Sequence, residues 1–137
     1  MNDSMAPSRQ AYEDLVALWS RAHRLGHLQS IASWDQAANM PVGGNEARAA
    51  AMAEMAVLMH GLLTAPELAA KHHLADGASL SQQERANLDE MKRHWTTSTA
   101  VDPDLVREIE LATTRCEHAW RSQRPANDWK GFLPNLE

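Results

Sequence analysis

Apolar residues recur at spacings of three and four along most of the chain, which is the period of an amphipathic α-helix. The first stripe predicts a helix from about Ser8 to about Ala38. Gly26 lies inside this stripe, and we interpret it as a point of close packing, with a kink as the alternative. A second helix, from about Asn45 to Leu63, carries two adjacent apolar stripes. Such an apolar helix is typical of the centre of a bundle, or of a surface that another molecule covers.

Capping residues and prolines predict shorter helices in the second half of the chain. The predicted segments are a short helix after a Thr64 cap to about Leu74, a helix from Ser81 to about Thr97, a helix from Asp102 to just before Pro125, and a last turn from Asp128 to Leu133 that Asn127 caps and Pro134 interrupts. No stretch alternates apolar and polar residues for long enough to predict a strand. We therefore expect an all-α fold, an antiparallel bundle of about five helices plus a short terminal turn. Residues 1–9 are expected to form a flexible N-terminus and residues 10–137 a single helical domain.

Composition narrows the possible environments and partners. The net charge is −5, from 13 Lys+Arg against 18 Asp+Glu, which disfavours a nucleic-acid partner. The single cysteine, Cys116, excludes an intramolecular disulfide and fits a reducing compartment. The first ten residues lack an apolar signal core, and no apolar stretch reaches the roughly 18 residues that a membrane span needs. We expect a cytoplasmic protein with no membrane partner.

Candidate chemistry within the chain is sparse. His23 and His27 have the i, i+4 spacing of a helical metal pair, but Arg24 stands where an H-E-x-x-H zinc motif needs glutamate. Adjacent His72 and His73 point to different sides of a helix. Cys116 lies on the apolar stripe of its helix, which indicates a buried, inert thiol. We predict no catalytic residue and no metal ligand in this chain.

One local string combines unusual residues. Ser33-Trp34-Asp35-Gln36 leads into Met40-Pro41-Val42-Gly43-Gly44 and then Glu46-Ala47-Arg48. Proline restricts the residue before it and glycine permits rare dihedrals, so a sharp turn is expected between the first two helices. In the simplest interpretation, Trp34 is a core anchor and Glu46 lies in the first turn of the next helix. The five tryptophans as a set are likewise spaced like core anchors.

At these residues the sequence resembles the N-terminal region of the carboxypeptidase Taq family of zinc metallopeptidases. The residues that carry the resemblance are Trp34, Asp35, Gln36, Met40, Pro41, Gly43, Gly44 and Arg48. Weaker similarities continue to the end of the chain, including His118-Ala119-Trp120 and Asn127-Asp128-Trp129. Two positions depart from the family pattern: Ala38 replaces a frequent threonine and Val42 a frequent second proline.

The resemblance implies a function that this chain does not complete. Members of the family carry H-E-x-x-H and a further glutamate ligand downstream of the matched region, and this chain contains neither. It implies the N-terminal helical part of a zincin-like metallocarboxypeptidase that removes C-terminal residues from peptides. The chain would form a wall or lid of the substrate groove, with the motif residues structural or groove-lining. It would bind no cofactor itself, zinc being expected in the full-length protein, and would be inactive alone.

Two other functions stay open. The apolar second helix suits a standalone helical module that binds a partner or itself, including as a homodimer, without enzymatic activity. A metal sensor built on His23 and His27 is the third possibility. In the peptidase interpretation the partner is the remainder of the peptidase chain.

Overall fold

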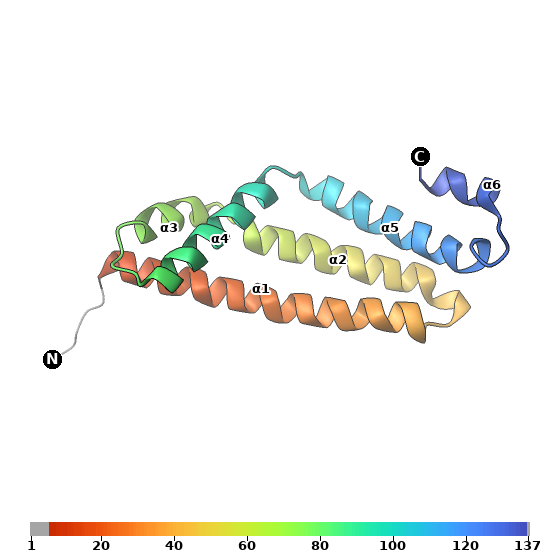
Figure 1. The fold of residues 1–137 in the computed structure, drawn as a ribbon, viewed down its shortest axis with the longest axis horizontal. Coiled ribbons are helices and arrows are strands. Elements are labelled where there is room, and N and C mark those ends of the chain that lie inside the picture. Colours follow the sequence, from red (N-terminus) through yellow and green to blue (C-terminus); the bar gives the residue numbers. More distant parts are fainter. Residues whose placement is uncertain (1–5, 137) are drawn as a thin grey trace. The chain divides into compact units, whose positions relative to one another are not determined.

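The computed structural model describes residues 6–136 (Figure 1). They form helices α1 (Pro7–Ala38), α2 (Asn45–Leu63), α3 (Glu67–Ala75), α4 (Gln82–Thr99), α5 (Pro103–Gln123) and α6 (Trp129–Phe132), with the short 3-10 turns η1 (Val42–Gly44) and η2 (Leu133–Asn135). These residues include no strand, so the predicted all-α fold is confirmed. Of the predicted flexible N-terminus, residues 1–5 lie outside the described residues, and residues 7–9 belong to α1.

The chain folds as two compact units. Unit 1 comprises the residues before Leu28 together with Met59–Val101. Unit 2 comprises Leu28–Leu58 and the residues from Asp102 onward. Helices α1 and α2 each contribute to both units. The single domain over residues 10–137 stays a prediction.

Unit 1 has a well-packed core. Side chains from α1, α3 and α4 converge there, including Leu15 and Leu88, both fully buried. Tyr12 and Met91 are also buried in this cluster, and Trp95 packs against it. These residues lie on the apolar stripes that the 3.6-residue period identifies, so amphipathicity and packing agree in unit 1.

Unit 2 buries far fewer apolar side chains than unit 1. Its buried apolar residues are Ala49, Met52, Ala53 and Phe132, two of them alanines. Among the described residues, ten of the eleven exposed large hydrophobic side chains belong to unit 2: Leu28, Ile31, Trp34, Leu58, Leu105, Ile109, Trp120, Trp129, Leu133 and Leu136. The prediction that tryptophans are core anchors is therefore wrong for three of the five. These side chains are exposed because the described residues leave their faces of unit 2 uncovered.

Helices α4 and α5 begin at the capping residues that the sequence predicts. Ser81 accepts from the Glu84 amide while the Glu84 side chain accepts from the Ser81 amide, a complete capping box. Asp102 caps α5, with Pro103 in its first turn. Two predicted caps are wrong, however. Thr64 donates its hydroxyl back to the His60 carbonyl and does not cap α3.

The second wrong cap is at the C-terminal end. Asp128, and not Asn127, accepts the hydrogen bond that caps α6, from the amide of Gly131. Asn127 instead adopts a left-handed backbone, with φ of 54°, a conformation that asparagine tolerates better than most residues. Pro134 does not end the helical structure, because a proline fits the first turn of the 3-10 helix η2.

Gly26 lies against Met59 of α2, but this packing does not require glycine. Helix α1 runs unbroken past it, and the Met59 methyl lies 3.5 Å from where a β-carbon would stand. That is ordinary van der Waals contact, so alanine would also fit. The alternative of a kink is not needed.

No single helix in residues 6–136 is long and apolar enough to cross a membrane, although α2 and α3, taken together as a bent pair, pass on length and composition alone.

Candidate functional site

The sequence motif lies in unit 2, where α1 ends and α2 begins (Figure 1). The last turns of α1 carry Trp34, Asp35 and Gln36, and the first turns of α2 carry Arg48. Trp34 is 65% exposed, so its interpretation as a core anchor is corrected. The structure thus brings most motif residues to one end of α1, while leaving the tryptophan on the surface.

Arg48 ties α2 to the end of α1. Its Nη2 atom pairs with Asp35 Oδ2 at 2.5 Å, and its Nη1 donates to the Ala32 carbonyl oxygen at 2.9 Å. A guanidinium presents several donors in one plane, so a single side chain can bind two acceptors. Both side chains of the pair are partly exposed. Asp35 and Arg48 therefore act as a clamp between the two helices.

Gln36 connects the motif to α5. Its side chain is buried, and Nε2 donates to Glu117 Oε2 at 2.9 Å. The other carboxylate oxygen of Glu117 accepts from Arg121 Nη2 at 2.8 Å. Glu117 was not among the predicted site residues, because it is 81 positions from Gln36. The only local signal was its i, i+4 spacing to Arg121.

The Met-Pro-Gly-Gly turn is tight but uses no glycine-specific backbone. The amide of Met40 donates to the Asp35 carbonyl, and that of Gly44 donates to the Pro41 carbonyl. No described glycine has a positive φ, so the expectation that rare dihedrals explain Gly43 and Gly44 is wrong. At Gly44 the reason is space: a β-carbon there would stand 3.1 Å from Met40 Cγ. At Gly43 nothing in the structure explains the choice.

A small hollow of about 250 Å³ lies beside this turn. Met40 and Pro41 form one side, and His118, Arg121 and Ser122 of α5 the other. The Nδ1 atom of His118 is buried and has no hydrogen-bond partner among the described residues. The two carboxylates nearby, Asp35 and Glu117, are both occupied in joining helices. The motif is therefore a polar brace, and its predicted lining of a substrate groove stays a prediction.

The described residues do not fit a catalytic zinc ion. Zinc in proteins takes three or four His, Cys, Asp or Glu ligands. Within residues 6–136, no group of three such side chains could hold a metal ion. His23 and His27 are both exposed on α1. Cys116 is partly buried, so its prediction as a buried thiol is only partly met.

His72 is a buried titratable group that the sequence reasoning considered only as a metal ligand. Its side chain is only 3% exposed, and neither ring nitrogen has a hydrogen-bond partner among the described residues. The ring lies against Trp95, with centroids 5.4 Å apart. Burial lowers the pKa of His72 most strongly and nearby Lys92 lowers it further, while Asp76 opposes them. Its spacing from Leu68 and Ala75 on one face of α3 was the available signal.

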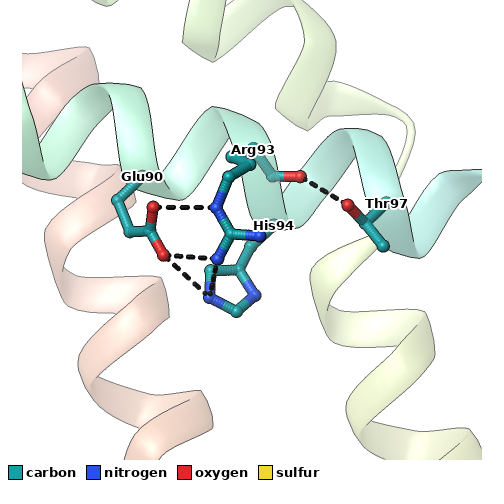
Figure 2. Close-up of polar contacts among 4 residues, drawn as sticks. All are labelled: Glu90, Arg93, His94 and Thr97. Atoms are coloured by element: carbon teal, nitrogen blue, oxygen red, sulfur yellow. Dashed lines mark hydrogen bonds and ion pairs between the residues drawn. The ribbon is translucent and has the colours of Figure 1, made fainter.

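Unit 1 also has a hollow of about 320 Å³ between α1 and α4, with Trp19 on one side and Glu90 and His94 on the other. Figure 2 shows Arg93 turned onto Glu90, with the His94 ring beside them. Arg93 makes two hydrogen bonds to the carboxylate, at 2.9 and 2.5 Å, and lowers the pKa of Glu90. The cluster lies along one helix and its side chains are exposed. An exposed carboxylate already paired with arginine is poorly suited to act as a base.

Comparison with known proteins identifies carboxypeptidases as relatives. The family model described as carboxypeptidase Taq (M32) metallopeptidase matches residues 14–137. Thermostable carboxypeptidase 1 of Thermus thermophilus is 31% identical over 131 residues, and that of Pyrococcus furiosus 30% over 129. Among solved structures, metallocarboxypeptidase 1 of Trypanosoma cruzi matches with a TM-score of 0.72 at 36% identity. The apo-Mg structure of the Pyrococcus furiosus carboxypeptidase matches with a TM-score of 0.69 at 31% identity.

The matches cover the chain almost completely and the relatives only in part. They span 93% of this chain in the Thermus and Trypanosoma proteins, but only 26% of the length of either relative. The matched part is the N-terminal region of the relatives. About three quarters of each relative therefore has no counterpart in this chain.

Proposed function

Because the chain belongs to the carboxypeptidase Taq (M32) metallopeptidase family, we propose that it forms the N-terminal helical part of a zinc-dependent carboxypeptidase that removes C-terminal residues from peptides. In this proposal the chain is a wall or lid of the substrate groove. The zinc ligands and the catalytic glutamate belong to the part of the fold that the chain does not span. Alone, it neither binds stoichiometric zinc nor hydrolyses peptides.

The placement of exposed apolar side chains is the observation that carries the proposal. They are concentrated in unit 2, whereas unit 1 has a packed core of its own. Apolar surface on this scale in a soluble protein marks a face that another molecule or domain covers. The relatives supply such a domain, since they are about four times longer than the matched region.

A chimera tests this directly. The N-terminal quarter of the Thermus thermophilus relative is replaced by this chain, and release of the C-terminal residue from a blocked dipeptide is measured with zinc. We expect turnover by the chimera and none above the buffer control by this chain alone. Hydrolysis by the isolated chain, or a folded, zinc-loaded chimera without activity, would contradict the proposal.

The same exposed side chains support one other function, a standalone helical module that binds a partner or itself. In that case the isolated chain would self-associate at micromolar concentration. Sedimentation of the isolated chain separates the two: a concentration-dependent dimer favours the module, and a monomer favours the peptidase part.

A further inference from the structure

Helix α5 turns its apolar stripe away from the interior of unit 2. The stripe repeats at spacings of three and four through Leu105, Ile109, Ala112, Cys116 and Trp120. Leu105 and Ile109 are 47% and 53% exposed, while the buried residue of the helix is a threonine, Thr114. An ordinary surface helix buries its apolar residues and exposes its polar ones, whereas this helix exposes leucine and isoleucine and buries threonine. Its apolar face is therefore available to a further element.

A hollow of about 520 Å³ opens on this stripe, where α6 and η2 pack back against α5. Its apolar walls are Cys116 and Trp120 on one side and Phe132 and Leu136 on the other. The Trp120 and Phe132 rings pack with centroids 4.9 Å apart, which fixes the aromatic wall. The space is large enough for one or two bulky apolar side chains.

We propose that the α5 stripe and this hollow are the docking surface for an amphipathic helix from the segment of the peptidase that follows the matched region; this inference rests on the proposed function. The stripe from Leu105 to Trp120 spans about 22 Å at 1.5 Å per residue, the length of about four helical turns. Spacings of three and four on one helix form the ridges and grooves that another helix packs into.

Chain continuity selects this occupant over others. The matched region is the N-terminal quarter of the relatives, so their chains continue beyond it. The match ends at residue 137, and Leu136, one residue earlier, lies on the wall of the hollow. In the relatives, the segment that follows the matched region therefore starts next to the position of this stripe. We expect the docking helix to carry aliphatic or aromatic residues at spacings of three and four. One of these residues should be bulky enough to fill the hollow.

Cys116 provides a direct probe, because it is the only cysteine of the chain and lines the hollow. Its alkylation by iodoacetamide is followed by mass spectrometry of the Cys116 peptide, in the isolated chain and in the chimera described above. We expect alkylation at least about tenfold slower in the chimera, since protection by docking scales with the docking free energy, 1.4 kcal/mol per tenfold. Equal rates in the two proteins would overturn the proposal.

Substitutions separate docking from general destabilisation. Ile109→Glu should leave the thermal midpoint of the isolated chain within about 2 °C, because the side chain is already exposed. In the chimera it should restore Cys116 alkylation toward the isolated-chain rate. The matched control is Leu74→Glu, an apolar residue of unit 1 that is 47% exposed. It should change neither quantity in either protein, and an equal effect of both substitutions would refute the docking surface.

The readouts distinguish this inference from the proposed function. An active chimera with freely reactive Cys116 contradicts the docking surface and leaves the peptidase function standing. A chimera that is inactive but protects Cys116 supports the docking surface and contradicts the function. Concentration-dependent protection of Cys116 in the isolated chain would show that a second copy covers the stripe, and would overturn the proposed occupant.

Discussion

Replacing Arg48 by alanine is expected to weaken unit 2 by removing the clamp between α1 and α2. Hydrogen bonds to charged groups contribute about 1.5–3 kcal/mol when sheltered, and exposed ion pairs about 0.2–1 kcal/mol. The side chains of Arg48 and Asp35 are 28% and 38% exposed, which places the pair toward the lower range. With the second bond, to the Ala32 carbonyl, the total loss is about 1–1.5 kcal/mol, or about 4 °C in the thermal midpoint.

Urea unfolding followed by circular dichroism measures this loss, and a double-mutant cycle with Asp35→Ala isolates the pair. We expect a coupling energy of about 0.5–1 kcal/mol. Arg48→Lys should recover part of the loss, because an ammonium keeps the charge but does not reproduce the planar pair of donors. Arg115→Ala, at an exposed arginine of α5, serves as the control, with a change within about 0.5 kcal/mol. A coupling energy of zero would show that the motif does not brace the helices.

Three further predictions concern unit 1 and two residues that titrate there. Leu88→Ala should lower the free energy of unfolding in urea by about 2–5 kcal/mol, because Leu88 is completely buried. The control Leu58→Ala in unit 2 should lower it by under about 0.5 kcal/mol, because that side chain is exposed. Equal losses in the two variants would contradict the assigned core. Since burial lowers the pKa of His72 below its ordinary 6.5, its contribution to stability is complete above pH 6.5 and is lost as the pH falls below that value. The decline in thermal midpoint from pH 7.5 to 5 should therefore shrink in His72→Leu, and an unchanged decline would refute the role. Hydrogen bonds from Arg9 and Ser81 lower the pKa of Glu84 to about 2. The contribution of Glu84 to the free energy of unfolding is therefore present above pH 4.5 and is lost between about pH 4.5 and 2. Glu84→Gln should flatten the dependence of stability on pH in that window alone.

The sequence predicts best what a few neighbouring residues determine. The capping box at Ser81 and the cap and proline at Asp102 place the starts of α4 and α5 correctly, because the atoms involved are within three residues of one another. The turn after α1 is predicted for the same reason. At Thr64 the reasoning fails because a hydroxyl can also bond back to the carbonyl four residues earlier, and that competing contact prevails.

Contacts between distant residues account for most of what the sequence does not reveal. The buried amide of Gln36 finds its acceptor at Glu117, 81 positions away, and no periodicity encodes that pairing. His72 is buried because α4 brings Trp95 against it, although its place on the α3 stripe was a usable indication. Periodicity also identifies the apolar face of α5 without saying what lies against it. An apolar stripe on a helix predicts that another element packs on it. The stripe does not show whether that element belongs to the same chain.

The motif and the exposed stripe have a common physical explanation. A unit that buries two alanines, a methionine and a phenylalanine gains little from the hydrophobic effect, so its helices need other means of holding their places. The Arg48–Asp35 clamp and the Gln36–Glu117 bond provide directional contacts that keep α1, α2 and α5 in register. Such bonds contribute geometry more than stability, because each exchanges bonds to water for bonds within the protein. Under the docking proposal above, unit 2 is a preformed surface whose apolar face gains stability when a further layer of helices packs on it.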